Sequence, residues 1–206
     1  MVVIHYTAMA SAAAAVETLS NPKTEVSAHY LIAEDGEALS LVPEAMRAWH
    51  AGRGQWGSVT DVNSRSIGIE LANTGFVPFA APQMDALTDL LTGIKARWGI
   101  RPERVIGHSD MAPGRKIDPG VRFDWRRLAL EGMSVWPTDW AADDPAGFVR
   151  WMRSFGCTAT DDEDLLLKVF RSRFRPHAAG PLDATDAGMI RNLSQRFPVD
   201  VNAAWA

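Results

Sequence analysis

Residues 107–120 read GHSDMAPGRKIDPG, and the predicted fold is built around this stretch. Its glycines and prolines predict an irregular loop without helix. His108 and Asp118 are residue types that bind first-row metals, and an ordered loop can bring both to one ion. One imidazole and one carboxylate do not complete a metal site. We therefore expect further ligands from other parts of the chain.

Strand patterns alternate with helix patterns around this loop. Short β-branched or alternating runs predict strands at residues 2–6, 27–33, 38–42, 66–71 and 104–107. An Asp-Gly turn joins the second of these to the third as a β-hairpin. Alanine content, apolar spacing and an aspartate N-cap predict helices at residues 9–19, 82–98 and 124–130. This alternation predicts an α/β fold in which a central mixed β-sheet is flanked by helices.

The sequence pattern changes after residue 132. We predict a catalytic domain at residues 1–132, a linker at 133–144 and a small helical module at 145–206. Within the module, helical patterns cover residues 145–155, 163–174 and 184–196. A module of this size is marginally stable alone and is expected to dock on the larger domain.

Composition excludes several classes of protein. The formal net charge of −4 argues against a nucleic-acid partner, which normally meets a basic face. Cys157 is the single cysteine, so it is expected to be a packing residue outside any disulfide or cysteine zinc cluster. The sequence predicts no transmembrane segment and no signal peptide. As written, the chain is predicted to be cytoplasmic. The sequence opens directly into a strand, as if an N-terminal segment were missing. If such a segment is missing, the predicted compartment is the periplasm.

Four histidines fall in the first 110 residues, at strand ends or in loops: His5, His29, His50 and His108. A single histidine at such a place is usually a hydrogen-bonded structural residue, and that interpretation stays open for each. Two imidazoles and one carboxylate, however, form the three-ligand set of a catalytic zinc site with an open position. His5, His108 and Asp118 can supply such a set.

Two further residues suit metal-assisted amide hydrolysis. Zinc lowers the pKa of a bound water towards ~7. Glu70, near the end of its strand, is a candidate to take that proton, and Lys116 is a candidate cation for the oxyanion. Alternatively, Glu70 is a solvated strand end and Lys116 a surface charge. Spacing alone does not decide between these interpretations.

Five motifs follow one another along the chain: VIHYT at 3–7, VSAHYLI at 26–32, RAWHAG at 47–52, SIGIEL at 66–71, and VIGHSD at 105–110 continued by KIDPG at 116–120. In this order they resemble the type-2 N-acetylmuramoyl-L-alanine amidases. This zinc family includes bacterial muropeptide-recycling amidases, phage amidase lysozymes and animal peptidoglycan recognition proteins. The similarity is greatest to the bacterial subgroup in which the third zinc ligand is aspartate instead of cysteine.

The resemblance implies hydrolysis of the amide between N-acetylmuramic acid, or its 1,6-anhydro form, and L-alanine of the stem peptide. It implies one Zn²⁺ per chain on His5, His108 and Asp118. Glu70 matches the family's general base and Lys116 its lysine that stabilises the transition state. Two rival interpretations remain: a peptidoglycan-recognition protein without catalysis, and a different zinc amide hydrolase such as a peptidase.

The resemblance also suggests how substrate is bound. Arg115 matches an arginine that meets a stem-peptide carboxylate in some members, and Tyr6 and Thr7 are expected in the same groove. His29 and His50 lie in family motifs without being ligands there, so we expect them beside the ligands or in the groove wall. The implied partners are soluble anhydro-muropeptides or the intact sacculus, and we expect a monomer.

Residues 165–187 are similar to a three-helix peptidoglycan-binding module attached to some of these amidases. The usual aromatic and Gly-Asp-Gly features are replaced by GPLD at 180–183. The alternative is a helical extension that only supports the catalytic domain. His177 is expected to be a surface residue.

Overall fold

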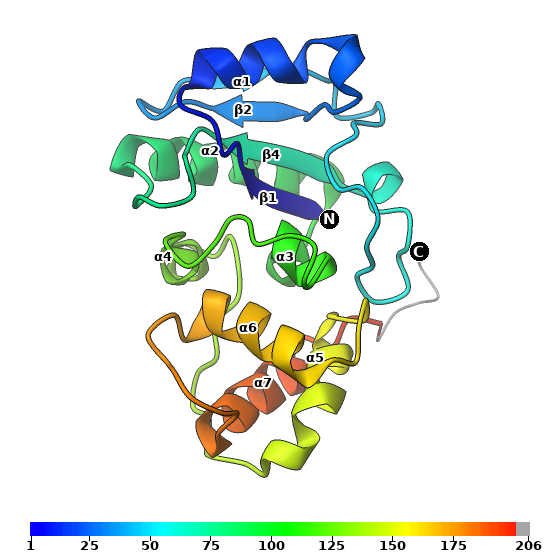
Figure 1. Ribbon diagram of the computed structural model, residues 1–206, viewed down its shortest axis with the longest axis vertical. Helices are drawn as coiled ribbons and strands as arrows, with labels where there is room; N and C mark the ends of the chain where they lie inside the picture. Colours follow the sequence, from blue (N-terminus) through cyan, green and yellow to red (C-terminus); the bar gives the residue numbers. More distant parts are fainter. Residues whose placement is uncertain (201–206) are drawn as a thin grey trace.

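A computed structural model describes residues 1–200, and residues 201–206 of the predicted module lie outside the described part. Its strands form a mixed sheet in the order β3-β2-β4-β1-β5. Figure 1 shows the neighbouring strands β2, β4 and β1 of this sheet. β2 and β3 pair antiparallel as the predicted hairpin, and the other pairs are parallel. The strands are β1 (Val2–Tyr6), β2 (Tyr30–Ile32), β3 (Ala38–Ser40), β4 (Ile67–Leu71) and β5 (Val105–Gly107). The predicted mixed sheet is confirmed.

The predicted helices are present; two have the predicted bounds, and the other four differ only in where they begin. They are α1 (Ala12–Leu19), α2 (Ala81–Trp98), α4 (Trp125–Leu130), α5 (Phe148–Phe155), α6 (Glu163–Phe174) and α7 (Ala184–Arg196). The first begins three residues later than predicted, because the Ser11 side chain accepts a hydrogen bond from the Ala14 N–H and caps the helix there. The second ends at Gly99, whose φ of +62° suits a left-handed C-terminal residue.

The prediction that residues 107–120 contain no helix was wrong. One helical turn, α3 (His108–Met111), starts directly after β5. Its first turn is stabilised by the Asp110 carboxylate, which accepts a hydrogen bond from the Gly107 N–H at 2.8 Å. The two prolines of the stretch and its later glycines, Gly114 and Gly120, come after this turn, so they do not oppose it.

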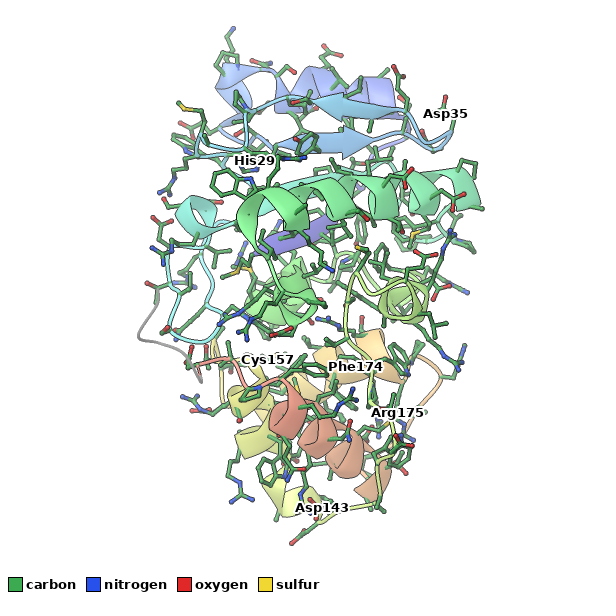
Figure 2. All side chains as sticks on the ribbon, turned by 180° about the vertical axis from the view of Figure 1, so that it is seen from behind. His29, Asp35, Asp143, Cys157, Phe174 and Arg175 are labelled. Carbon is green, nitrogen blue, oxygen red and sulfur yellow. The ribbon has the colours of Figure 1, made fainter. Side chains whose placement is uncertain are left out.

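The two faces of the sheet have different partners. Alternate residues of β1 and β4, such as Ile4 and Ile69, pack in a core with α2. The helix α2 covers that face: it lies behind β4 in Figure 1 and in front of the sheet in Figure 2, which is the view from behind. The intervening residues, including His5 and Glu70, point to the other face. The second face therefore carries polar groups near the carboxyl ends of β1 and β4, whereas Val3 and Ile106 on this face pack in a second core.

The three C-terminal helices share a hydrophobic core with the sheet. Buried residues of α5–α7 cluster with Trp56 and with residues of β1, β5 and α3. Figure 2 places Cys157 and Phe174 at this junction, and both are buried. Gly156 lies so close to Trp56 that a Cβ at this position would be 2.3 Å from the indole ring. The helices thus pack directly on the rest of the protein.

Residues 133–144, the predicted linker, run without helix or strand between α4 and the 3₁₀ turn Pro145–Gly147. The predicted boundaries of separate domains stay a prediction. Within residues 1–200, no helix is both long enough and apolar enough to cross a bilayer.

Candidate active site

The predicted ligands meet at the carboxyl end of the parallel strands. His5 is the penultimate residue of β1, and it lies in register with Glu70 of β4. His108 follows β5 on the other side of β1 as the first residue of α3. Asp118 approaches from the loop after α3. Open α/β sheets commonly place their ligand-binding sites at this edge. Here β1, β4, α3 and the loop after α3 each contribute a residue to one such site.

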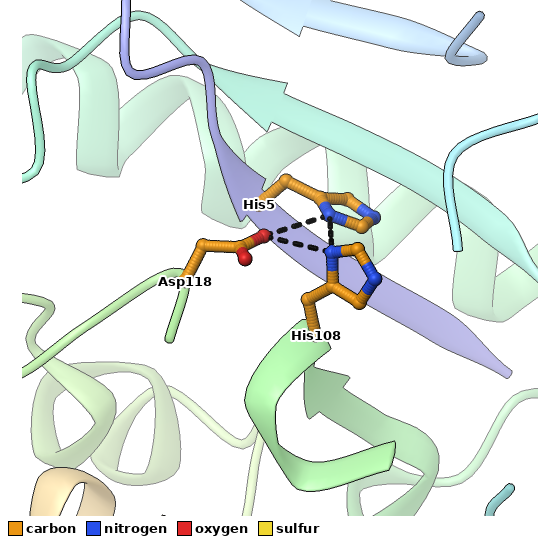
Figure 3. Close-up of side chains that lie close together, drawn as sticks. All are labelled: His5, His108 and Asp118. Atoms are coloured by element: carbon orange, nitrogen blue, oxygen red, sulfur yellow. Dashed lines mark hydrogen bonds and ion pairs between the residues drawn. The ribbon is translucent and has the colours of Figure 1, made fainter. Parts of the chain in front are cut away.

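Three side-chain atoms converge at this point (Figure 3). Nδ1 of His5 lies 2.9 Å from Nδ1 of His108 and 2.9 Å from Oδ2 of Asp118. Nδ1 of His108 lies 3.0 Å from the same carboxylate oxygen. All three residues are buried, with at most 8% of any of them exposed. Two imidazole nitrogens and a carboxylate oxygen form a donor set that divalent metals such as zinc bind, and their spacing allows a shared ion.

The surroundings of His5 and Asp118 favour the protonation states that a metal requires. Burial, together with the nearby His108, lowers the pKa of His5 to about 4, so His5 is neutral at pH 7. Burial alone would raise the pKa of Asp118, but hydrogen bonds to His108 and His5 hold it below its usual range. Metal ligands must be neutral imidazoles and ionised carboxylates, and His5 and Asp118 already are.

The far nitrogens of both histidines have partners that orient the rings. Nε2 of His108 lies 2.8 Å from the Ala51 carbonyl oxygen, so that nitrogen carries the proton and Nδ1 keeps its lone pair. Nε2 of His5 lies 3.0 Å from Nδ1 of His50, whose own Nε2 lies 3.2 Å from the Ser66 hydroxyl. His50 therefore lies beside a candidate ligand, as expected, and serves to orient it.

A glycine makes room for His50. A Cβ at Gly68 in β4 would lie 2.3 Å from Cγ of the His50 ring. Such a contact is shorter than van der Waals packing allows, so any other residue at Gly68 would displace the imidazole.

His29 is fully buried and both of its ring nitrogens are used. Nδ1 accepts a hydrogen bond from the Gly68 N–H at 2.9 Å, and Nε2 donates to the Met46 carbonyl at 3.0 Å. Because burial lowers its pKa, this side chain stays neutral in the folded protein. His29 thus supports the position of the strand rather than binding the candidate metal.

We expect His29 to make folding stability depend on pH. In the unfolded chain a histidine takes up a proton near pH 6.5, whereas folded His29 does so only at lower pH. The unfolded state therefore binds more protons below about pH 6.5, and stability is lost as the pH falls through that range. His29→Gln should reduce this loss, by up to about 1.4 kcal/mol per pH unit.

The measurement is urea unfolding at pH 7.5 and 5.5, with chelator present to remove metal linkage. His177→Gln is a matched control because His177 is exposed. Equal pH dependence in wild type and His29→Gln would contradict the prediction.

Glu70 faces the ligands from the neighbouring strand. Its Oε2 atom is buried and has no hydrogen-bond partner within residues 1–200. Burial and the nearby Asp118 raise the pKa of Glu70 to about 8, an effect that Lys116 opposes. A carboxylate with an unpaired buried oxygen and a raised proton affinity has the properties of a general base.

Lys116 and Arg115 lie on the exposed wall of the same site. Lys116 lowers the pKa of both His5 and Glu70, so its charge acts on the candidate reaction centre. Nη2 of Arg115 donates to the Ala51 carbonyl at 2.6 Å, the same oxygen that His108 contacts. This bond holds the guanidinium at the edge of the groove.

Tyr6 and Thr7 both line the groove, but they differ in what remains free. The Thr7 hydroxyl is engaged with the backbone of Asn73 and Met9, which ties the loop after β1 to the loop after β4. Tyr6 is only partly buried, and burial and Asp118 raise its pKa. Within residues 1–200, the Tyr6 hydroxyl makes no side-chain hydrogen bond of this kind, so Tyr6 is the residue of the two whose polar group is free to meet a ligand in the groove.

The convergent residues open into a groove of about 570 Å³. The groove contains all eight sequence-predicted site residues. Sequence reasoning missed further wall residues from α1 and from the segments before β2 and after β3, among them Ala15, Thr18, Leu19, Val26 and Trp49. The exposed indole of Trp49 was a signal, because a large apolar side chain in solvent often marks a binding surface.

Comparison with known proteins agrees with this arrangement. Residues 1–121 match the family model described as N-acetylmuramoyl-L-alanine amidase. The chain belongs to the N-acetylmuramoyl-L-alanine amidase family. This match contains every candidate site residue, and it confirms the family and the class of enzyme predicted from the five motifs.

Within this amidase family, the chain is similar over nearly its whole length to AmiD of Escherichia coli. The two are 33% identical over 97% of this chain and 84% of AmiD. The solved complex of AmiD with the substrate anhydro-N-acetylmuramic acid-L-Ala-D-γ-Glu-L-Lys superposes with a TM-score of 0.88, covering 96% of this chain and 89% of that one, at 32% identity.

Two other relatives differ in how much of this chain they match. AmpDh3 of Pseudomonas aeruginosa, solved in complex with anhydromuramic pentapeptide, is 32% identical with a TM-score of 0.87, over 97% of this chain and 92% of that one. The 1,6-anhydro-N-acetylmuramyl-L-alanine amidase AmpD of Enterobacter cloacae is 41% identical, but only over 50% of this chain and 55% of its own length. The C-terminal helices therefore have counterparts in the structures of AmiD and AmpDh3.

Proposed function

We propose that this protein is a zinc-dependent amidase. It would hydrolyse the bond between the lactyl carbonyl of N-acetylmuramic acid, or its 1,6-anhydro form, and L-alanine of the peptidoglycan stem peptide. The observation that carries the proposal is the convergence of His5, His108 and Asp118 within a groove that also holds Glu70. Two relatives of nearly the same length were solved with anhydro-muropeptides bound, which supports this substrate class.

Nδ1 of His5, Nδ1 of His108 and Oδ2 of Asp118 would hold one zinc ion. Bound there, zinc supplies Lewis acidity, which polarises a carbonyl and lowers the pKa of a water. His50 and the Ala51 carbonyl keep the two imidazoles in the orientation that presents their Nδ1 atoms.

Glu70 and Lys116 would carry out the proton and charge chemistry. The Glu70 carboxylate takes the proton of the attacking water and then delivers it to the leaving amine of L-alanine. The Lys116 ammonium stabilises the negative charge that develops on the carbonyl oxygen. The raised pKa helps Glu70 in the first role, because the ionised form of a weaker acid is a stronger base.

Arg115, at the edge of the groove, would pair with a carboxylate of the stem peptide. Tyr6 and Thr7 would form the adjoining wall, with Thr7 acting mainly through the loops that it joins. The two relatives' complexes favour soluble anhydro-muropeptides as substrate, and intact sacculus is the alternative. The predicted compartment, cytoplasm or periplasm, is part of the same question, and cell fractionation of the full gene product addresses it.

The proposal is tested by identifying the bond that breaks. Purified protein with one equivalent of zinc is incubated with anhydro-muramyl tripeptide and, separately, with the free tripeptide. We expect mass spectrometry to find anhydro-muramic acid and intact tripeptide from the first substrate and no change in the second.

Cleavage within the free tripeptide would instead identify a peptidase. Binding of the muropeptide without cleavage, at saturating zinc, would identify a recognition protein. Either result would overturn the proposed activity.

A further inference from the structure

Arg173 in α6 is a buried cation whose partners, among them Asp110 of α3, lie outside the C-terminal helices. It and Asp110 of α3 are each only 3% exposed. Burying two charges is costly unless they are paired and hydrogen-bonded. An arginine in the core between the C-terminal helices and the sheet therefore has a specific task beyond apolar packing.

The contacts of Arg173 surround the junction between β5 and α3. Nη1 donates a hydrogen bond to Oδ2 of Asp110. Nη2 donates to the Val105 carbonyl at 3.2 Å and to the Ser134 hydroxyl at 3.1 Å. The guanidinium lies over the Trp125 ring, 4.0 Å from its centroid. A planar cation is thus fixed by an aromatic face and by partners on both sides of the junction.

Asp110 links this cation to the candidate metal ligands. The oxygen that pairs with Arg173 also accepts the hydrogen bond from the Gly107 N–H, which stabilises the first turn of α3. His108 is the first residue of that turn. The next residue, Ser109, donates its N–H to the Asp118 carbonyl at 2.9 Å. The backbone of α3 therefore sets the positions of two of the three candidate ligands.

We propose that Arg173 is a positioning residue for the metal site, acting through Asp110 and α3. By neutralising the buried carboxylate and binding the Val105 carbonyl, it fixes where β5 ends and α3 begins. His108 is then presented to His5 and Asp118 without further rearrangement. The C-terminal helices in this way contribute to zinc affinity, although they contain none of the ligands. This inference rests on the zinc site of the proposed function.

The same helix contains a matched control. Arg171 is also buried, and it pairs with Asp186 of α7 and with the carbonyls of Gly180 and Pro181. All of these partners lie within the C-terminal helical segment. Loss of Arg171 should therefore destabilise the helices without changing the junction of β5 and α3.

The test measures the zinc dissociation constant by competition with a chromophoric chelator, at a temperature where every variant is folded by circular dichroism. We expect Arg173→Met to weaken zinc binding by about 10- to 100-fold, as loss of a residue that orients metal ligands typically does. Arg173→Lys, which keeps the charge, should recover part of the affinity. Arg171→Met should bind zinc within about 3-fold of wild type, because outer partners of a ligand, and not remote ion pairs, set metal affinity.

A double-mutant cycle tests the route through Asp110. The effect of Asp110→Asn on zinc affinity should be smaller in the Arg173→Met background than in wild type, since the two residues act as one unit. If Arg173→Met does not fold, Arg173→Lys and Asp110→Asn decide the question.

Wild-type zinc affinity in the Arg173 variants, or equal losses in Arg173→Met and Arg171→Met, would overturn the inference. Failure of the wild-type protein itself to bind zinc would instead overturn the proposed function.

Discussion

Glu70→Gln is expected to bind zinc as tightly as the wild type and to lose about 10²- to 10⁴-fold in kcat on a muropeptide. The amide has nearly the shape of the carboxylate, so the wall of the site is preserved. It cannot accept a proton from water, however, and the activation free energy should rise by about 3–5 kcal/mol. Steady-state kinetics together with zinc content by mass spectrometry measure both effects.

Two further variants sharpen this experiment. Glu70→Ala should give the same pattern, retained zinc with most activity lost, because the proton acceptor is absent in both. Glu34→Gln, in the exposed hairpin turn, is the control for a carboxylate-to-amide change away from the site. Full turnover by Glu70→Ala would remove Glu70 from the mechanism.

His108→Ala, in contrast, should lose zinc and activity together. With one imidazole removed, His5 and Asp118 alone form a poor site, so the variant should bind no zinc at micromolar free metal. Activity should fall by more than about 10³-fold, since a catalytic metal contributes several kcal/mol of charge stabilisation.

Metal removal from the wild type provides the comparison. Chelation should abolish activity, and added zinc should restore it in the wild type but not in His108→Ala. His177→Ala, which removes an exposed histidine, should behave as the wild type. His108→Ala with undiminished zinc affinity would contradict the assigned ligand set.

Local sequence patterns predicted the elements that position the site. The strands that carry His5 and Glu70 as penultimate residues, and the short strand before His108, are present where expected. Each pattern reflects side chains that pack on a pleated, buried surface, and that preference is encoded within a few residues. The convergence of His5, His108 and Asp118 was predicted from the family motifs and from the rule that sites lie at strand ends. Both arguments can be made without knowing the order of the strands in the sheet.

Features that depend on contacts distant in sequence could not be predicted. Asp110 stabilises α3 and also pairs with Arg173, 63 residues further along the chain. The local pattern of glycines and prolines in residues 107–120 contains no sign of that partner. Likewise, His50 could be placed near the ligands but its bond to His5 could not be foreseen, because it depends on the space above Gly68. Such contacts are set by tertiary packing.

The register of β1 with β4 makes one spacing in the site independent of chain length. His5 and Glu70 are paired residues on adjacent strands, so the separation of their backbones is the interstrand distance of about 4.8 Å. The exposed hairpin turn at residues 34–37 lies between these strands in sequence. An insertion there would add only loop-closure entropy, about 0.6 kcal/mol for each doubling of loop length. That turn is therefore a site where a tag or a second domain can be grafted without changing the spacing of His5 and Glu70.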